Sequence, residues 1–152
     1  MRTDAEAAED ALADRVYAVL PLLHISVFGF SALPNALAEY VPSIPPRFLY
    51  REALSTRALR AQAFVHELCH VFLHPPGSAE DTAEHESVDE ERAVHEAAAH
   101  ICLAFEVDGY RRLMEGNGVQ IAAPEPEDSE LIERLVVEVS AVLKDPIVAS
   151  SW

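Results

Sequence analysis

Hydrophobic and polar residues follow a helical spacing in four long stretches of this chain. Apolar residues recur every three or four positions in each stretch, as from Leu12 to Leu23 in the first. Residues that can cap a helix precede three of the stretches, at Thr3, at Ser55 or Thr56, and at Ser87. The pattern predicts amphipathic helices over residues 3–23, 55–73, 87–107 and 129–143.

Shorter segments between these helices favour strands and turns. His24–Phe30 and Arg47–Tyr50 are rich in residues that prefer strands, and we expect the two strands to be neighbours in a small sheet. A short helix is expected from the Ser31 region to about Tyr40, and another over residues 109–115. The expected fold class is α+β: a compact, mainly helical domain with a small β-sheet.

Length and composition fit one soluble domain spanning residues 1–152. Half of the 152 residues are hydrophobic, no apolar run reaches the roughly 20 residues of a membrane span, and the first residues are acidic. We therefore expect a cytoplasmic protein without a membrane segment. Cys69 and Cys102 lie within apolar helical patterns, where reduced, packed cysteines are expected.

The net charge of −15 argues against nucleic acid as a partner, because an acidic surface repels phosphate backbones. Carboxylates are densest between residues 80 and 96, at Glu80, Asp81, Glu84, Glu86, Asp89, Glu90, Glu91 and Glu96. This acidity predicts a basic or neutral substrate segment or partner.

Candidate chemistry lies in the middle of the second predicted helix, at His66-Glu67-Leu68-Cys69-His70. Residues four apart on a helix differ by only about 40° around its axis, so both imidazoles can bind one metal ion. Glu67 lies between the two histidines in the sequence, about 100° around the axis from His66, where it can reach a water beside the metal as a general base. The H-E-x-x-H pattern predicts a zinc site with Glu67 as the catalytic residue.

A catalytic zinc needs a third protein ligand and one open position. The extended pattern with a third downstream histidine is absent, because Pro76 occupies that position. A glutamate from a second helix packed across the first is the other common solution, and Glu96 in the third predicted helix, beside small alanines, is our expected third ligand.

Several other residues compete with Glu96 for this role. Glu91 and His95 lie in the same helix, but we expect Glu91 near the helix start to face solvent or the cap. His100 shares the face of Glu96 and is expected either beside the ligands or at an oxyanion site, or as a semi-buried histidine with no such role. His74 follows His70 by one helical turn, and we expect it to lie beyond the metal ligands, at the end of the helix.

The segment from Arg47 to Pro75, with its H-E-L-C-H-V-F-L-H-P end, and the segment Glu96–Phe105 resemble the ImmA/IrrE metallopeptidases. The resemblance covers residues 47–107, and it implies a zincin-like fold with one zinc ion per chain. It assigns His66, His70 and Glu96 as ligands and Glu67 as base. His100 stands where members of the family have Asn or Asp.

The resemblance also implies a function, since several members cleave helix-turn-helix repressors. We expect a zinc-dependent endopeptidase that cleaves a regulatory protein such as a transcriptional repressor. Two alternatives are a zinc-binding regulator that acts through protein contacts without catalysis, and a metal-free helical interaction module. The oligomeric state is left open by the sequence.

Overall fold

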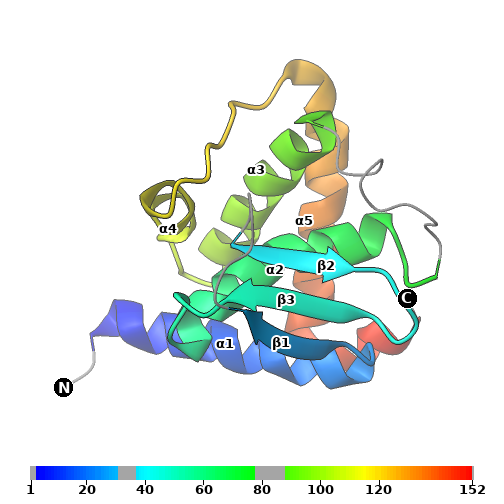
Figure 1. Ribbon diagram of the computed structural model, residues 1–152. Coiled ribbons are helices and arrows are strands. Elements are labelled where there is room, and N and C mark those ends of the chain that lie inside the picture. The colour runs from blue at the N-terminus through cyan, green and yellow to red at the C-terminus, as the bar shows by residue number, and fades with distance from the viewer. Residues whose placement is uncertain (1–2, 31–36, 78–87, 152) are drawn as a thin grey trace.

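The computed structural model describes residues 3–30, 37–77 and 88–151, and it shows an α+β protein that is mainly helical (Figure 1). The predicted fold class is confirmed at this level. The elements in chain order are α1 (Asp4–Leu22), β1 (Ser26–Phe30), β2 (Ala38–Val41), β3 (Arg47–Arg51), α2 (Arg57–Leu73), α3 (Val88–Ala104), α4 (Tyr110–Gly116), η2 (Pro126–Asp128), α5 (Ser129–Lys144) and η3 (Pro146–Ser151). Within the described residues, no helix combines the length and apolar character that a membrane crossing requires.

The strands form one sheet in the order β1-β3-β2. Strand β1 pairs in parallel with β3, which confirms the predicted neighbours, and β2 pairs with β3 in antiparallel fashion. The helix expected up to Tyr40 is wrong over Ala38–Val41, where Ala38 and Tyr40 are buried and Glu39 and Val41 less so. This alternation is typical of a strand with one face on the core. The beginning of that expected helix, residues 31–36, lies outside the described residues.

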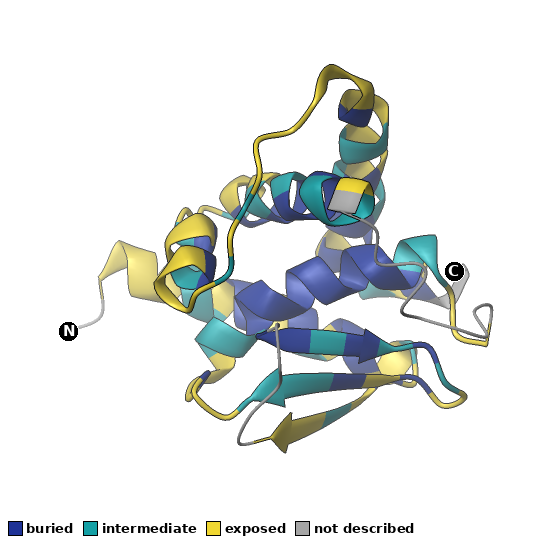
Figure 2. Ribbon diagram, turned by 45° about the horizontal axis from the view of Figure 1, so that its top comes forward, coloured by how far each residue is buried: buried dark blue, intermediate teal, exposed yellow. Residues whose placement is uncertain are grey.

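Helix α2 forms the centre of the molecule. The Thr56 hydroxyl caps its start by accepting a hydrogen bond from the Leu59 N–H at 3.2 Å, and the helix ends at Leu73 before two prolines. Every residue from 61 to 71 is buried, as the dark ribbon in Figure 2 shows. Burying polar side chains here is costly unless they find partners, so the polar residues of α2 must contact one another or neighbouring elements.

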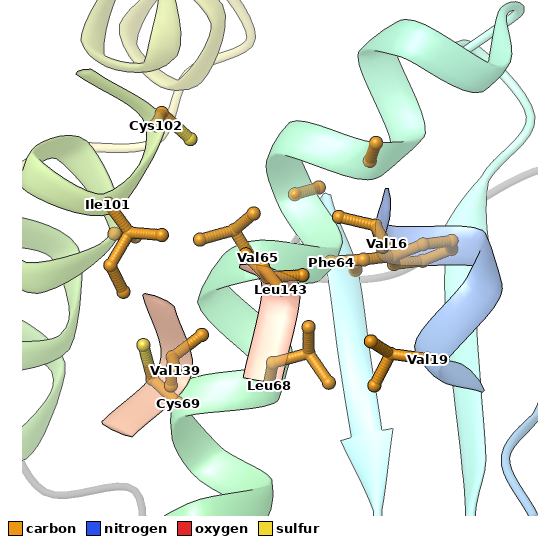
Figure 3. Close-up of a cluster of buried hydrophobic side chains, with 14 of the residues drawn as sticks. Val16, Val19, Phe64, Val65, Leu68, Cys69, Ile101, Cys102, Val139 and Leu143 are labelled. Carbon is orange, nitrogen blue, oxygen red and sulfur yellow. The ribbon is translucent and has the colours of Figure 1, made fainter. Parts of the chain in front are cut away.

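The other helices pack around α2. One side of α2 meets α1, where Phe64 lies beside Val16, and another side meets α3, where Val65 faces Ile101 (Figure 3). Both cysteines are reduced and buried in this core, and burial raises the pKa of the Cys102 thiol to about 12. The two cysteines are therefore packing residues, as predicted.

Helix α3 packs against both α2 and α5. Small Ala97 and Ala98 are fully buried on the packed side, which lets the helices approach closely. The helix ends at Ala104, before the predicted end near residue 107, because Glu106 adopts a left-handed backbone conformation with φ of 66°. Its predicted cap, Ser87, lies outside the described residues.

Candidate metal centre

Helix α2 places His66 and His70 one turn apart on the same face. Their Nε2 atoms are 3.1 Å apart, and both side chains are almost completely buried. Two nitrogen atoms this close, with both lone pairs available, can bind one metal ion together. The predicted shared direction of the two imidazoles is confirmed.

The third group at this position is Glu91 of α3. Its Oε1 lies 2.6 Å from His70 Nε2, and its Oε2 lies 3.3 Å from His66 Nε2. One possible ligand atom from each of His66, His70 and Glu91 lies within 4.8 Å of the other two. Among the described residues, these three side chains form a group that could hold a metal ion. Burial disfavours the charged form of Glu91, but its hydrogen bonds with His66 and His70 hold its pKa well below the usual value.

Glu96, the expected third ligand, lies elsewhere, and this prediction is not supported. Its carboxylate accepts a hydrogen bond from Arg111 at 2.5 Å and lies 3.0 Å from His100 Nε2. Glu96 follows Glu91 by five positions, which places the two residues about 140° apart around the helix axis. When Glu91 faces α2, Glu96 must therefore face away from it.

The spacing of apolar residues along α3 places Glu91 on the same face of the helix as its buried residues. Val94, Ala98 and Ile101 are fully buried, and Glu91 precedes them by three, seven and ten positions, the spacing of a single helix face. Glu91 contacts the two histidines of α2 but keeps 34% of its side chain exposed, so the expectation that it would face solvent or the cap holds only in part. This periodicity was the signal in the sequence that could have selected Glu91.

His100 lies away from the metal position, which gives no support to a role beside the ligands or at an oxyanion site, one of the two possibilities considered for it. Its side chain is 52% exposed and pairs with Glu96, on the side of α3 away from the two histidines of α2. A role near the metal was considered for His100 because it shares a helix face with Glu96. Since Glu96 lies away from the centre, His100 lies away from it as well.

The outer nitrogens of the two α2 histidines are held by residues that the sequence did not identify. His66 Nδ1 lies 2.8 Å from the hydroxyl of Tyr110, and His70 Nδ1 lies 2.9 Å from Glu90 Oε2. Partners of this kind fix the ring orientation and leave Nε2 directed at the metal position. Burial tends to lower the pKa of His70, but its hydrogen bonds with Glu90 and Glu91 outweigh this effect and raise the pKa well above the usual value.

The two remaining histidines of this region differ in their surroundings. His74 Nε2 lies 2.7 Å from Glu90 Oε1, so Glu90 bridges His74 and His70. His95 is buried, with Nε2 3.4 Å from Glu91 Oε2. Burial, together with the nearby His66 imidazole, lowers the pKa of His95 to about 3.

Glu67 lies beside the cluster without belonging to it. Its Oε2 is 3.6 Å from His66 Nε2, and the residue is 4% exposed. A buried carboxylate next to a metal position can accept and return a proton, which is the position that the sequence motif predicted for it.

Two imidazoles and one carboxylate, with a second carboxylate beside them, are the donor set of one class of catalytic zinc sites. The residues therefore fit zinc, and the set supplies three ligands. Comparison of the chain with models of known protein families, with curated proteins and with solved structures gave no match. We therefore infer a function from the geometry of the centre.

Proposed function

We propose that this protein is a zinc-dependent endopeptidase with a zincin-like fold, in which His66, His70 and Glu91 hold the metal. The observation that carries the proposal is the convergence of these three side chains from α2 and α3, with Glu67 beside them. When bound, zinc would polarise a peptide carbonyl and lower the pKa of a water molecule.

Glu67 would accept a proton from the attacking water and transfer it to the leaving amine. Its proximity to His66 supports this role, because a general base must lie within reach of the reacting water. The low exposure of Glu67 would keep bulk water from competing for the proton.

The resemblance to ImmA/IrrE metallopeptidases supports a regulatory protein as substrate, such as a helix-turn-helix repressor. The net charge of −15 favours basic or neutral substrate segments. We infer that one zinc ion per chain serves this reaction.

The test uses Glu67→Gln, which removes the base but keeps a side chain of similar shape. Cleavage of a library of quenched fluorescent peptides with neutral and basic sequences should fall by roughly 10²- to 10⁴-fold, the usual contribution of a general base, while zinc content stays unchanged. Glu96→Gln is the matched control, because it alters a glutamate on the other side of α3.

Two results would count against the proposal. Cleavage by Glu67→Gln at the parent rate would exclude the mechanism. Wild-type protein with a full complement of zinc that cleaves none of these peptides, and no repressor encoded beside its gene, would favour the non-catalytic regulator.

A further inference from the structure

The hydroxyl of Tyr110 lies between two imidazoles. It is 2.8 Å from His66 Nδ1 and 2.8 Å from His95 Nδ1, and all three residues are buried. A phenol hydroxyl has only one hydrogen atom. Tyr110 can therefore donate to one of these nitrogens, and it must accept from the other for both contacts to be hydrogen bonds.

The position of His66 decides the direction of these bonds. His66 Nε2 faces His70 Nε2 at 3.1 Å and Glu91 Oε2 at 3.3 Å, so it must offer a lone pair there when a metal is bound. The hydrogen of a neutral His66 is then on Nδ1 and is donated to the oxygen of Tyr110.

The tautomer of His95 follows from that of His66. Since the Tyr110 oxygen accepts from His66, its own hydrogen is donated to His95 Nδ1, and His95 carries its hydrogen on Nε2. That nitrogen lies 3.4 Å from Glu91 Oε2. The contacts thus lead from one proposed ligand, His66, through Tyr110 and His95 to another, Glu91.

We propose that the hydrogen bonds from His66 through Tyr110 to His95 form a relay that fixes the tautomer of His66, and that the 3.4 Å contact of His95 Nε2 with Glu91 Oε2 helps to orient Glu91 for the metal. The inference rests on the metal centre of the proposed function, and it makes His95 a positioning residue. His95 is not a fourth ligand in this arrangement, because its Nδ1 is used by Tyr110 and its Nε2 carries the hydrogen. The fourth position therefore stays open for substrate and water.

The relay connects α4 with the metal centre, whose proposed ligands come from α2 and α3. Tyr110 is the first residue of α4 and is 1% exposed, and its hydroxyl contacts two histidines, His66 and His95. The position of α4 is consequently linked to the geometry of the metal ligands.

The first experiment is nitrogen NMR of the ¹⁵N-labelled chain loaded with ¹¹³Cd²⁺ in place of zinc. We expect cadmium–nitrogen coupling at Nε2 of His66 and His70 only, and a His95 with a protonated Nε2 and a bare Nδ1. Coupling to His95, or the opposite tautomer of His95, would overturn the relay.

The second experiment compares Tyr110→Phe with Tyr40→Phe. Each change deletes the hydroxyl of a buried tyrosine, but Tyr40 donates its hydrogen bond to the carbonyl oxygen of His74 at 2.7 Å and takes no part in the relay. Tyr110→Phe should lower zinc affinity by roughly 10- to 100-fold in a chelator competition at matched circular dichroism, as loss of an outer partner does. Equal affinities in the two variants would overturn the relay.

The third experiment asks whether a hydrogen-bond donor can replace His95. His95→Gln keeps an N–H group near Glu91 and should retain more zinc affinity than His95→Leu, which has none. Equal losses in both variants would mean that His95 acts only by filling space, contrary to the relay.

These readouts separate the relay from the proposed function. Wild-type protein that binds neither metal contradicts the centre and the relay together. Metal bound at His66 and His70 with the wrong tautomer at His95 contradicts the relay alone, and none of the three readouts requires turnover.

Discussion

Helix α3 carries two pairs of glutamate and histidine with the same spacing, Glu91 with His95 and Glu96 with His100, and they meet opposite surroundings. The first pair faces α2 and contacts the buried histidines of the candidate centre. The second pair lies on the other side, with the His100 side chain 52% exposed. A glutamate followed four positions later by a histidine therefore does not by itself identify a candidate ligand. The position of the pair relative to the apolar face of the helix does.

The partners of the two glutamates differ as well. Glu96 pairs with Arg111, a permanent cation that satisfies its charge. Glu91 lies among the imidazoles of His66, His70 and His95, and two of these, His66 and His70, can offer an Nε2 lone pair to a metal. Only Glu91 has surroundings that a metal ion would complete.

The largest expected effect comes from removing each glutamate in turn. Glu91→Ala should lower zinc affinity by more than the roughly 100-fold seen for loss of outer partners, because it deletes a ligand. Glu96→Ala should leave zinc affinity within a few-fold of wild type, measured by competition with a chromogenic chelator. Loss of zinc from Glu96→Ala but not from Glu91→Ala would reverse the assignment.

A smaller effect is expected at Glu90, which contacts the outer nitrogen of His70. Glu90→Gln should weaken zinc binding by roughly 10- to 100-fold, because the ring of His70 loses a charged partner that orients it. Asp89→Asn is the control, since the neighbouring Asp89 side chain is 82% exposed. The same chelator competition applies, and equal affinities in the two variants would show that Glu90 does not orient His70.

The Glu96–His100 pair should matter little to folding, because the His100 side chain is 52% exposed, although that of Glu96 is only 14% exposed. His100→Ala leaves Glu96 paired with Arg111 and should change the free energy of unfolding by less than about 1 kcal/mol, as ion pairs with an exposed partner do. Urea denaturation measures this change. A loss of several kcal/mol would mean that this side of α3 is structurally important, and the contrast between the pairs would then be weaker.

The smallest effect concerns pH and the Glu96–Arg111 pair. Burial tends to raise the pKa of Glu96, but the hydrogen bond from Arg111 outweighs it, and the folded pKa is below 4.5. The stabilisation is therefore complete above about pH 4.5 and is lost as the pH falls through the lower, folded pKa. The stability difference between wild type and Glu96→Gln should shrink on acidification over this range; a difference that grows would contradict the sign.

Local signals predicted most of the helices correctly. The hydroxyl of Thr3 accepts a hydrogen bond from the Glu6 N–H and that of Thr56 from the Leu59 N–H, as the capping patterns indicated. The pairing of His24–Phe30 with Arg47–Tyr50 was also predictable from strand-forming residues, and it positions the sheet beside α2. Such features depend on neighbours in the sequence.

Features that depend on distant contacts were missed. Strand β2 is a strand because it pairs with β3, although its short sequence beside Pro34 favours a helix. Tyr110 and Glu90 approach the α2 histidines from other parts of the chain, and no spacing rule connects them. For Glu91 the signal was present in its helical spacing from the buried residues Val94, Ala98 and Ile101, but the small alanines beside Glu96 favoured the other side of the helix.

The most direct test of the centre is a crystal structure of the zinc-soaked protein with an anomalous difference map at the zinc edge. We expect one peak per chain, about 2 Å from Nε2 of His66, Nε2 of His70 and a carboxylate oxygen of Glu91. A zinc peak beside Glu96 and His100, or none at His66 and His70 in crystals exposed to excess zinc, would contradict this expectation.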